Sequence, residues 1–218
     1  LVFLSLSYPY LSDNVIKILK ANNNIVILLV TGHANGVGEQ RAFLHKLMLE
    51  GCETPVVVVR QYSESESEDL QIKAAADMGT ILLDGFGNGI MLRNEGDIPE
   101  SKIDSYMYGI LQAARVRTSK TEYISCPSCG RTLFNLQDTI ARIKVSTSHL
   151  KHLKIGIMGC IVNGPGEMAD ADYGYVGAEP GKVSLYKRKE QVERNIPSEQ
   201  AVDRLIQLIK DNGDWVEP

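Results

Sequence analysis

The sequence has few cysteines, no excess of positive charge and no long apolar run, and each shortage excludes a class of protein. Only 4 of its 218 residues are cysteine, whereas an extracellular disulfide scaffold spreads more of them in pairs. A net charge of −4 argues against nucleic acid as a partner. No apolar run approaches the roughly 20 residues that span a bilayer, and the first residues lack the basic region of a signal peptide. We therefore expect a globular, cytoplasmic protein that binds neither nucleic acid nor a membrane.

The cysteines that are present point to one metal site. Cys126 and Cys129 are two residues apart, a spacing that lets both thiols face the same metal centre. Cys160 stands in the glycine-rich segment Gly159–Glu167, where backbone N–H groups can come close to bound sulfur because glycine has no side chain. The sequence therefore predicts a site with three thiol ligands.

The fourth ligand is left open by the sequence, although zinc sites and iron–sulfur clusters normally take four. Cys52 lies far upstream, at the end of an expected helix, and is expected to be a buried apolar residue. The nearer candidates are His149, His152 and Glu167. A histidine would complete a structural zinc site, whereas Glu167 is an exchangeable ligand that would leave a metal position free for chemistry. Spacing alone leaves zinc and iron both open.

Residues 1–118 alternate between apolar runs and helical patterns, as in α/β folds. The expected strands are Leu1–Ser7, Ile25–Val30, Pro55–Val59 and Thr80–Asp84. The expected helices are Asn14–Ala21 with Ser12 or Asp13 as N-cap, Gly38–Glu50, a helix that begins in the acidic run Ser63–Asp69, and Pro99–Val116. Continuous apolar strands predict a parallel sheet covered on both faces. Part of a barrel and part of an open doubly wound sheet both fit this pattern.

Two glycine-rich segments in this part follow expected strands. Gly85, Gly87 and Gly89 would cradle a phosphate if they lay at the carboxyl end of a strand, but a plain turn is the favoured interpretation. His33 also follows an expected strand among glycines and would be able to touch a ligand there. Here too a turn is favoured.

Residues 119–218 are expected to form a second, small α/β domain with its metal loops at one edge. Leu153–Met158 reads as a strand that delivers Cys160 into its loop. The remaining expected elements are a helix at Leu133–Thr147, a hairpin of Lys182–Lys187 and Gln191–Arg194, and a final helix that Ser198 caps and that ends at Gly213.

The cysteine segments resemble the cluster-binding motifs of the 4-hydroxy-3-methylbut-2-enyl diphosphate synthases. They read Cys-Pro-Ser-Cys-Gly-Arg from Cys126 and Gly-Cys-Ile-Val-Asn-Gly-Pro-Gly-Glu from Gly159. The likeness runs from about Thr121 to Pro218, and Ala169–Gly177 and Asn212–Pro218 are similar to the longer, plastid-like, three-domain form of the family. The resemblance implies that residues 1–118 are the C-terminal part of an inserted, barrel-like βα domain and that residues 119–218 are an iron–sulfur domain.

The resemblance also implies a cofactor and a reaction. Cys126, Cys129, Cys160 and Glu167 would hold a 4Fe-4S cluster. The reaction would be the reductive ring opening of 2-C-methyl-erythritol 2,4-cyclodiphosphate in the methylerythritol phosphate route to isoprenoids. Glu167 would release its iron during the reaction, and Asn163 would donate a hydrogen bond to a ligand or to substrate.

The family's partners and location follow as expectations. Flavodoxin or ferredoxin would donate electrons, and the full-length enzyme would be a homodimer in the bacterial cytoplasm or the plastid stroma. The family's substrate-binding barrel has no counterpart in this sequence, which opens on Leu1 without Met. We therefore interpret the chain as a C-terminal fragment that is inactive alone. The alternative to an enzyme is a structural or interaction module that a zinc ion stabilises and that has no catalytic activity.

Overall fold

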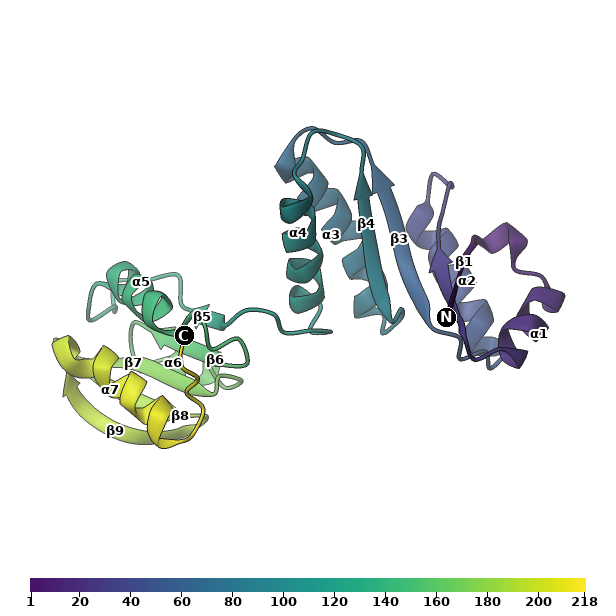
Figure 1. The fold of residues 1–218 in the computed structure, drawn as a ribbon. Helices are drawn as coiled ribbons and strands as arrows, with labels where there is room; N and C mark the ends of the chain where they lie inside the picture. The colour runs from purple at the N-terminus through teal and green to yellow at the C-terminus, as the bar shows by residue number, and fades with distance from the viewer. The chain divides into compact units, whose positions relative to one another are not determined.

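The computed structural model describes residues 1–218, which divide into two compact units, Leu1–Arg117 and Thr118–Pro218 (Figure 1). Both units are α/β, which confirms that part of the predicted fold class, whereas the barrel-like and iron–sulfur assignments of the two units stay predictions. What each unit contributes to function stays a prediction. None of the helices combines the length and the apolar character that crossing a membrane requires.

The first unit is a parallel sheet whose strands follow one another in chain order, β1-β2-β3-β4. The strands are β1 (Val2–Leu6), β2 (Ile25–Leu29), β3 (Val56–Tyr62) and β4 (Gly89–Asn94). The helices are the short 3-10 turn η1 (Tyr8–Tyr10), α1 (Asp13–Ala21), α2 (Gly36–Leu49), α3 (Ser67–Leu83) and α4 (Glu100–Ala113). Ser12 caps α1 as expected, because its hydroxyl accepts a hydrogen bond from the Val15 N–H.

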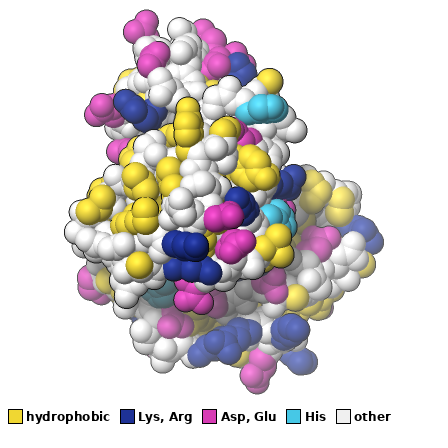
Figure 2. Space-filling model, turned by 90° about the vertical axis from the view of Figure 1, so that its right-hand side faces the viewer, with side chains coloured by type: hydrophobic (Ala, Val, Ile, Leu, Met, Phe, Trp, Pro, Cys, Tyr) yellow, Lys and Arg dark blue, Asp and Glu magenta, His cyan; other side chains and the backbone are white.

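One face of this sheet is packed and the other is only partly covered. Alternate strand residues such as Leu29 and Val58 are fully buried and join a core that includes Phe43 of α2. Phe3 and Met91 point the other way along their strands and remain 60% and 39% exposed. Figure 2 looks at the molecule from the side of β1 and α1 and shows hydrophobic side chains among charged ones there. Both faces of the sheet therefore carry apolar side chains, but the prediction of a sheet covered on both faces is right for one face only, because Phe3 and Met91 remain exposed on the other.

The predicted strand at Thr80–Asp84 is wrong, because Thr80–Leu83 form the last turn of α3 and Asp84 is its C-cap. Ile81 is buried on the same face of the helix as Met78 and Ala74. A short apolar run has the same pattern in a buried strand and on a buried helix face, so periodicity alone misassigns it. The fourth strand is instead β4, whose glycine, arginine and asparagine weaken its strand signal.

Because Thr80–Leu83 are helical, the Gly85–Gly89 segment does not follow a strand. It leads into β4, whose first residue is Gly89, and so lies at the amino end of a parallel strand and not at the carboxyl end that a phosphate cradle requires. Gly85 and Gly87 have φ values of 81° and 84°, which favour glycine. The segment is therefore a turn, and the favoured interpretation is confirmed.

The second unit is a five-stranded mixed sheet in chain order, β5-β6-β7-β8-β9. Its strands are β5 (Glu122–Ser125), β6 (Lys154–Met158), β7 (Tyr173–Glu179), β8 (Lys182–Lys187) and β9 (Glu190–Pro197). The first three are parallel, and β8 pairs antiparallel with both β7 and β9, which confirms the predicted hairpin. Its helices are α5 (Leu136–Thr147), α6 (Gly164–Glu167) and α7 (Ser198–Asp211).

The two long helices and the short one contribute to different cores of this sheet. Ile143 of α5 and Leu205 of α7 are fully buried in one core with Tyr175 of β7. Met168, directly after α6, belongs to a separate core with Val176 of β7. Ser198 is the first residue of α7 and Pro197 occupies the cap position, so the predicted cap is off by one residue.

Candidate metal centre

The two cysteine segments meet because they follow neighbouring parallel strands. β5 runs directly into Cys126, and β6 runs through Gly159 into Cys160. Ser125 lies opposite Ile157 in the register of the two strands. Parallel neighbours end at the same edge of a sheet, so both loops leave the sheet side by side.

Backbone and side-chain hydrogen bonds join the two loops. The Gly159 N–H donates to the Cys126 sulfur at 3.3 Å, and the Leu133 N–H donates to the Gly159 carbonyl at 3.1 Å. This second bond explains why α5 begins at Leu136 and not at Leu133 as predicted, because Leu133 is engaged by the neighbouring loop. The side chain of Asn135 then caps the helix by accepting from the Asp138 N–H at 3.3 Å.

The turn that carries Cys126 and Cys129 is fixed by a threonine. The Thr132 hydroxyl oxygen accepts from the Cys129 N–H at 3.1 Å and lies 3.2 Å from the Ser128 hydroxyl. Ser128 has a φ of 66°, a left-handed conformation that is unusual for a residue with a side chain. A Cβ at position 159 would lie 2.7 Å from the Thr132 hydroxyl oxygen, so only glycine lets the second loop approach this turn.

The loop that carries Cys160 is anchored beyond α6. Met168 lies over Gly156 of β6 and Gly174 of β7, where an added Cβ would come within 2.6 and 2.5 Å of its side chain. Inside the loop, the Asn163 carbonyl accepts from the N–H groups of Gly166 and Glu167 at 3.1 and 3.0 Å. The Asn163 side chain makes no capping bond and lines a cavity with Glu167, which follows one helical turn later.

One cavity of about 140 Å³ brings these side chains together. It is lined by Cys126, Pro127, Ser128, Cys129, Arg131, Met158, Cys160, Asn163, Gly164 and Glu167. All the residues predicted as ligands or as catalytic groups are among them. Their roles stay predictions, since no group of three histidine, cysteine or acidic side chains is close enough here to hold a single metal ion.

Arg131 gives the cavity its only positive side chain. Hydrogen bonding from the Arg131 backbone and side chain, together with its positive charge, lowers the pKa of the Cys129 thiol. Cys129 is the exposed thiol of the three, while Cys126 and Cys160 are half-buried. The sequence contained Arg131 in its first cysteine motif but gave no reason to single it out, because the contact depends on the conformation of the turn.

The other candidate ligands lie elsewhere. His149 packs edge-on against Trp215, with ring centres 4.9 Å apart, and neither it nor His152 lines the cavity. Cys52 is 8% exposed and lies in the core of the first unit, as predicted.

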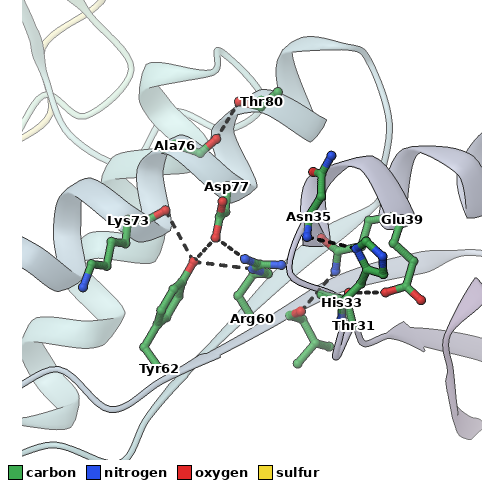
Figure 3. A network of polar contacts seen from close by, with 12 residues as sticks. Thr31, His33, Asn35, Glu39, Arg60, Tyr62, Lys73, Ala76, Asp77 and Thr80 are labelled. Atoms are coloured by element: carbon green, nitrogen blue, oxygen red, sulfur yellow. Dashed lines mark hydrogen bonds and ion pairs between the residues drawn. The ribbon is translucent and has the colours of Figure 1, made fainter.

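A second polar cluster lies in the first unit, at the carboxyl ends of β2 and β3 (Figure 3). His33 belongs to the turn after β2, and its Nδ1 accepts from the Asn35 N–H at 2.9 Å, so the favoured interpretation as a turn is confirmed. Arg60 pairs with Asp77 of α3, and the Tyr62 hydroxyl donates to the same carboxylate at 2.6 Å. Burial and this hydrogen bond raise the pKa of Tyr62 to about 12. These contacts tie β3 to α3.

The second unit is thus a small mixed α/β domain with a thiol-lined cavity at the carboxyl edge of two parallel strands. Residues 122–211 match the family described as GcpE protein C-terminal domain. The chain as a whole is similar to proteins named 4-hydroxy-3-methylbut-2-en-1-yl diphosphate synthase.

Relatives with this name match almost the whole chain. It is 65% identical over 217 residues to the protein of Parabacteroides distasonis named 4-hydroxy-3-methylbut-2-en-1-yl diphosphate synthase (flavodoxin). The proteins of the same name from Phocaeicola vulgatus and Chlorobaculum tepidum are 61% identical over 217 residues and 55% identical over 177. These matches cover 99%, 100% and 79% of the chain. The chain spans only 35%, 35% and 24% of the relatives' own lengths.

Proposed function

We propose that this chain takes part in the reductive ring opening of 2-C-methyl-erythritol 2,4-cyclodiphosphate to 4-hydroxy-3-methylbut-2-enyl diphosphate, with its second unit supplying an iron–sulfur centre. The supporting observation is the convergence of three thiols and one carboxylate on a single cavity. The name of these relatives, which includes the product and flavodoxin, agrees with this assignment. The reaction takes up two electrons and loses a hydroxyl group as water, so it requires a redox centre.

The donor set fits a 4Fe-4S cluster. Cys126, Cys129 and Cys160 offer three soft sulfur ligands, and Glu167 offers a hard oxygen ligand for the fourth iron. The Gly159 N–H already donates to the Cys126 sulfur, which is the kind of contact that stabilises ligand sulfur in such sites. When bound, the cluster supplies electrons one at a time and an iron that can act as a Lewis acid.

The chain's own residues would hold the cofactor, exchange at the metal and bind the ligand or substrate. The three cysteines hold the cofactor against the sheet edge, where loop-to-loop hydrogen bonds fix them. Glu167 is exposed at the end of α6, so its carboxylate can turn away without disturbing a core. Asn163 presents a side-chain amide that no helix cap engages and that is therefore free to donate to a ligand or substrate oxygen.

The zinc alternative is less well supported. A structural zinc site would need a fourth sulfur or nitrogen ligand, and His149 and His152 do not line the cavity. His149 is instead packed against Trp215. A ferredoxin-type carrier is also disfavoured, because it would need a fourth thiolate and Cys52 belongs to the core of the first unit.

The first unit would be part of a βα barrel in the complete protein. Its four parallel strands follow one another without the reversal of strand order that marks doubly wound sheets. Its second sheet face is apolar and partly exposed, as the inner face of an incomplete barrel would be. The substrate-binding barrel of the family would lie outside this chain, as would a homodimeric partner and the electron donor. We therefore expect the chain alone to be inactive.

Iron determination tests the proposed cofactor site. Chains reconstituted without oxygen are expected to bind about four irons. Cys160→Ser should bind less than about a quarter of that amount, because two remaining thiolates do not retain a cluster. Cys52→Ala is the matched control and should bind iron normally, since Cys52 lies in the core of the first unit. One zinc and no iron in the wild-type chain would reject the proposal in favour of a structural site.

A further inference from the structure

Four asparagines in this sequence are followed directly by glycine. They are Asn35, Asn88, Asn163 and Asn212. Such pairs are chemically labile, because glycine has no side chain to shield its backbone nitrogen from the side-chain carbonyl of the asparagine before it. How fast each pair reacts depends on how firmly the fold holds the asparagine side chain and the backbone around it.

Three of the four side chains are held by hydrogen bonds. The Asn35 side chain accepts from the Gly38 N–H at 3.0 Å and so caps α2, a helix of 14 residues. The Asn88 side chain accepts from the Val56 N–H at 2.9 Å, directly before β4. The Asn212 side chain donates to a carbonyl of α7 at 2.7 Å. Each of these side chains must leave its partner before it can react.

Asn163 differs from the other three, because its side chain is exposed and makes no hydrogen bond. The N–H of Gly164 is the first of α6 and has no acceptor either. The Asn163 carbonyl does accept from the N–H groups of Gly166 and Glu167. Since α6 has only four residues, rotation of the Asn163 backbone opens one short turn, whereas the other three pairs border longer elements.

We propose that Asn163 is a site of spontaneous deamidation in the cluster-free chain. The Gly164 nitrogen attacks the side-chain carbonyl carbon of Asn163 and a bond forms between these two atoms. The side-chain nitrogen leaves as ammonia and takes the proton of the Gly164 N–H. Water then opens the resulting cyclic imide at the side-chain carbonyl, which gives aspartate, or at the backbone carbonyl, which gives isoaspartate. No oxidant, reductant or enzyme takes part.

Either product changes the cavity that Asn163 lines. Aspartate places a second carboxylate one helical turn from Glu167, in a cavity also lined by the thiols, where like charges repel. Isoaspartate also inserts an additional methylene group into the backbone between Cys160 and Glu167. A chain that has reacted at Asn163 therefore loses the ability to take up its cluster, a consequence that rests on the proposed function.

Peptide mass spectrometry tests the reactive site directly. The iron-free chain is incubated in warm, mildly alkaline buffer with a reductant, and aspartate and isoaspartate are quantified at all four positions. In the folded chain Asn163 should convert about five- to tenfold faster than each of the others, because each of those must first break a side-chain hydrogen bond. In urea the four pairs should react at similar rates, since only the local sequence then matters. Faster conversion of another pair, or a preference for Asn163 that persists in urea, would overturn the proposal.

The consequence for the cofactor is tested with Asn163→Gln as the matched control, because glutamine keeps the amide but forms its larger ring far more slowly. Each chain is aged, loaded with iron without oxygen and compared with its own fresh sample. Iron uptake of the wild-type chain should fall in proportion to the converted fraction, and that of Asn163→Gln should not fall. Equal losses in both chains, or full uptake after conversion of Asn163, would contradict this consequence. A fresh wild-type chain that takes up no iron would instead refute the proposed function, while the mass spectrometry would still decide whether Asn163 reacts.

Discussion

Single residues at the cavity divide into proposed cofactor ligands and residues proposed to contact the cofactor or the substrate. The Gly159 N–H of the neighbouring loop donates to the Cys126 sulfur, and the Cys129 N–H donates to the Thr132 hydroxyl, so both positions are set before a cofactor arrives. Asn163 directly precedes the short helix α6 and Glu167 ends it, and the side chains of both have fewer constraints. The site thus combines rigid sulfur ligands with side chains that are able to move.

Asn163→Ala is expected to separate cofactor binding from turnover. Its side chain caps nothing, so α6 and the iron content should be unchanged. Loss of a hydrogen bond next to the metal centre should lower turnover of the complete enzyme by about 10- to 100-fold. Iron content and ring-opening rate, measured on the same preparation, check this. A variant that binds little iron, or one that turns over normally, would show that Asn163 has a different role.

At the scale of elements, glycines decide how closely the strands and loops of the second unit approach. Gly177 of β7 lies against the backbone of Gly159, where a Cβ would come within 3.0 Å of the carbonyl carbon. Gly159 in turn lies against Thr132. The cavity therefore depends on residues of β7 that never touch a ligand.

Gly177→Ala should push the Cys160 loop away from β7. We expect it to destabilise the second unit by about 1–3 kcal/mol, as overpacking does, and to lower iron binding. The single tryptophan, Trp215, belongs to this unit and contacts His149, so its fluorescence in urea reports the unfolding free energy. Gly166→Ala is the control, because a Cβ there meets open space. Equal unfolding free energies for the two variants would contradict this account of the packing.

The polar cluster between β3 and α3 predicts a pH dependence for the first unit. The pKa of Tyr62 is raised to about 12, so folding favours its neutral form. The stability it contributes is fully present below pH 10, the ordinary pKa of tyrosine, and is lost as the pH rises toward 12. Denaturation followed by circular dichroism between pH 9 and pH 11.5 should show a steeper loss for wild type than for Tyr62→Phe. Tyr10→Phe, at a residue 72% exposed, should behave like wild type.

At the scale of the whole molecule, the sequence predicted most elements because their hydrophobic periods and caps agree with the packing. Leu29 and Val58 stand in continuous apolar runs that the parallel sheet buries. The prediction of a strand at Thr80–Asp84 was wrong because this apolar run completes the buried face of α3. β7 went unpredicted because Gly174 and Gly177 weaken its strand pattern, and those glycines are required by Met168 and by the Gly159 loop.

The sequence predicted which residues line the candidate site, but it did not predict the contacts around them. The spacing of Cys126 and Cys129 and the motif around Cys160 are local features that a sequence displays directly. The contacts of Arg131 and Thr132 with Cys129 arise from the left-handed turn at Ser128, and residue types do not reveal that turn. His149 lies away from the cavity because it packs on Trp215, and residue types do not reveal this contact either.

The central claim is that three thiolates and the Glu167 carboxylate hold one 4Fe-4S cluster, and Mössbauer spectroscopy of the ⁵⁷Fe-loaded chain tests it most directly. The account predicts about four irons per chain, one of them distinguishable from the other three by its oxygen ligand. In Glu167→Cys, a fourth thiolate should make the four irons alike. Four equivalent irons in the wild-type chain, or a spectrum that Glu167→Cys leaves unchanged, would contradict the claim.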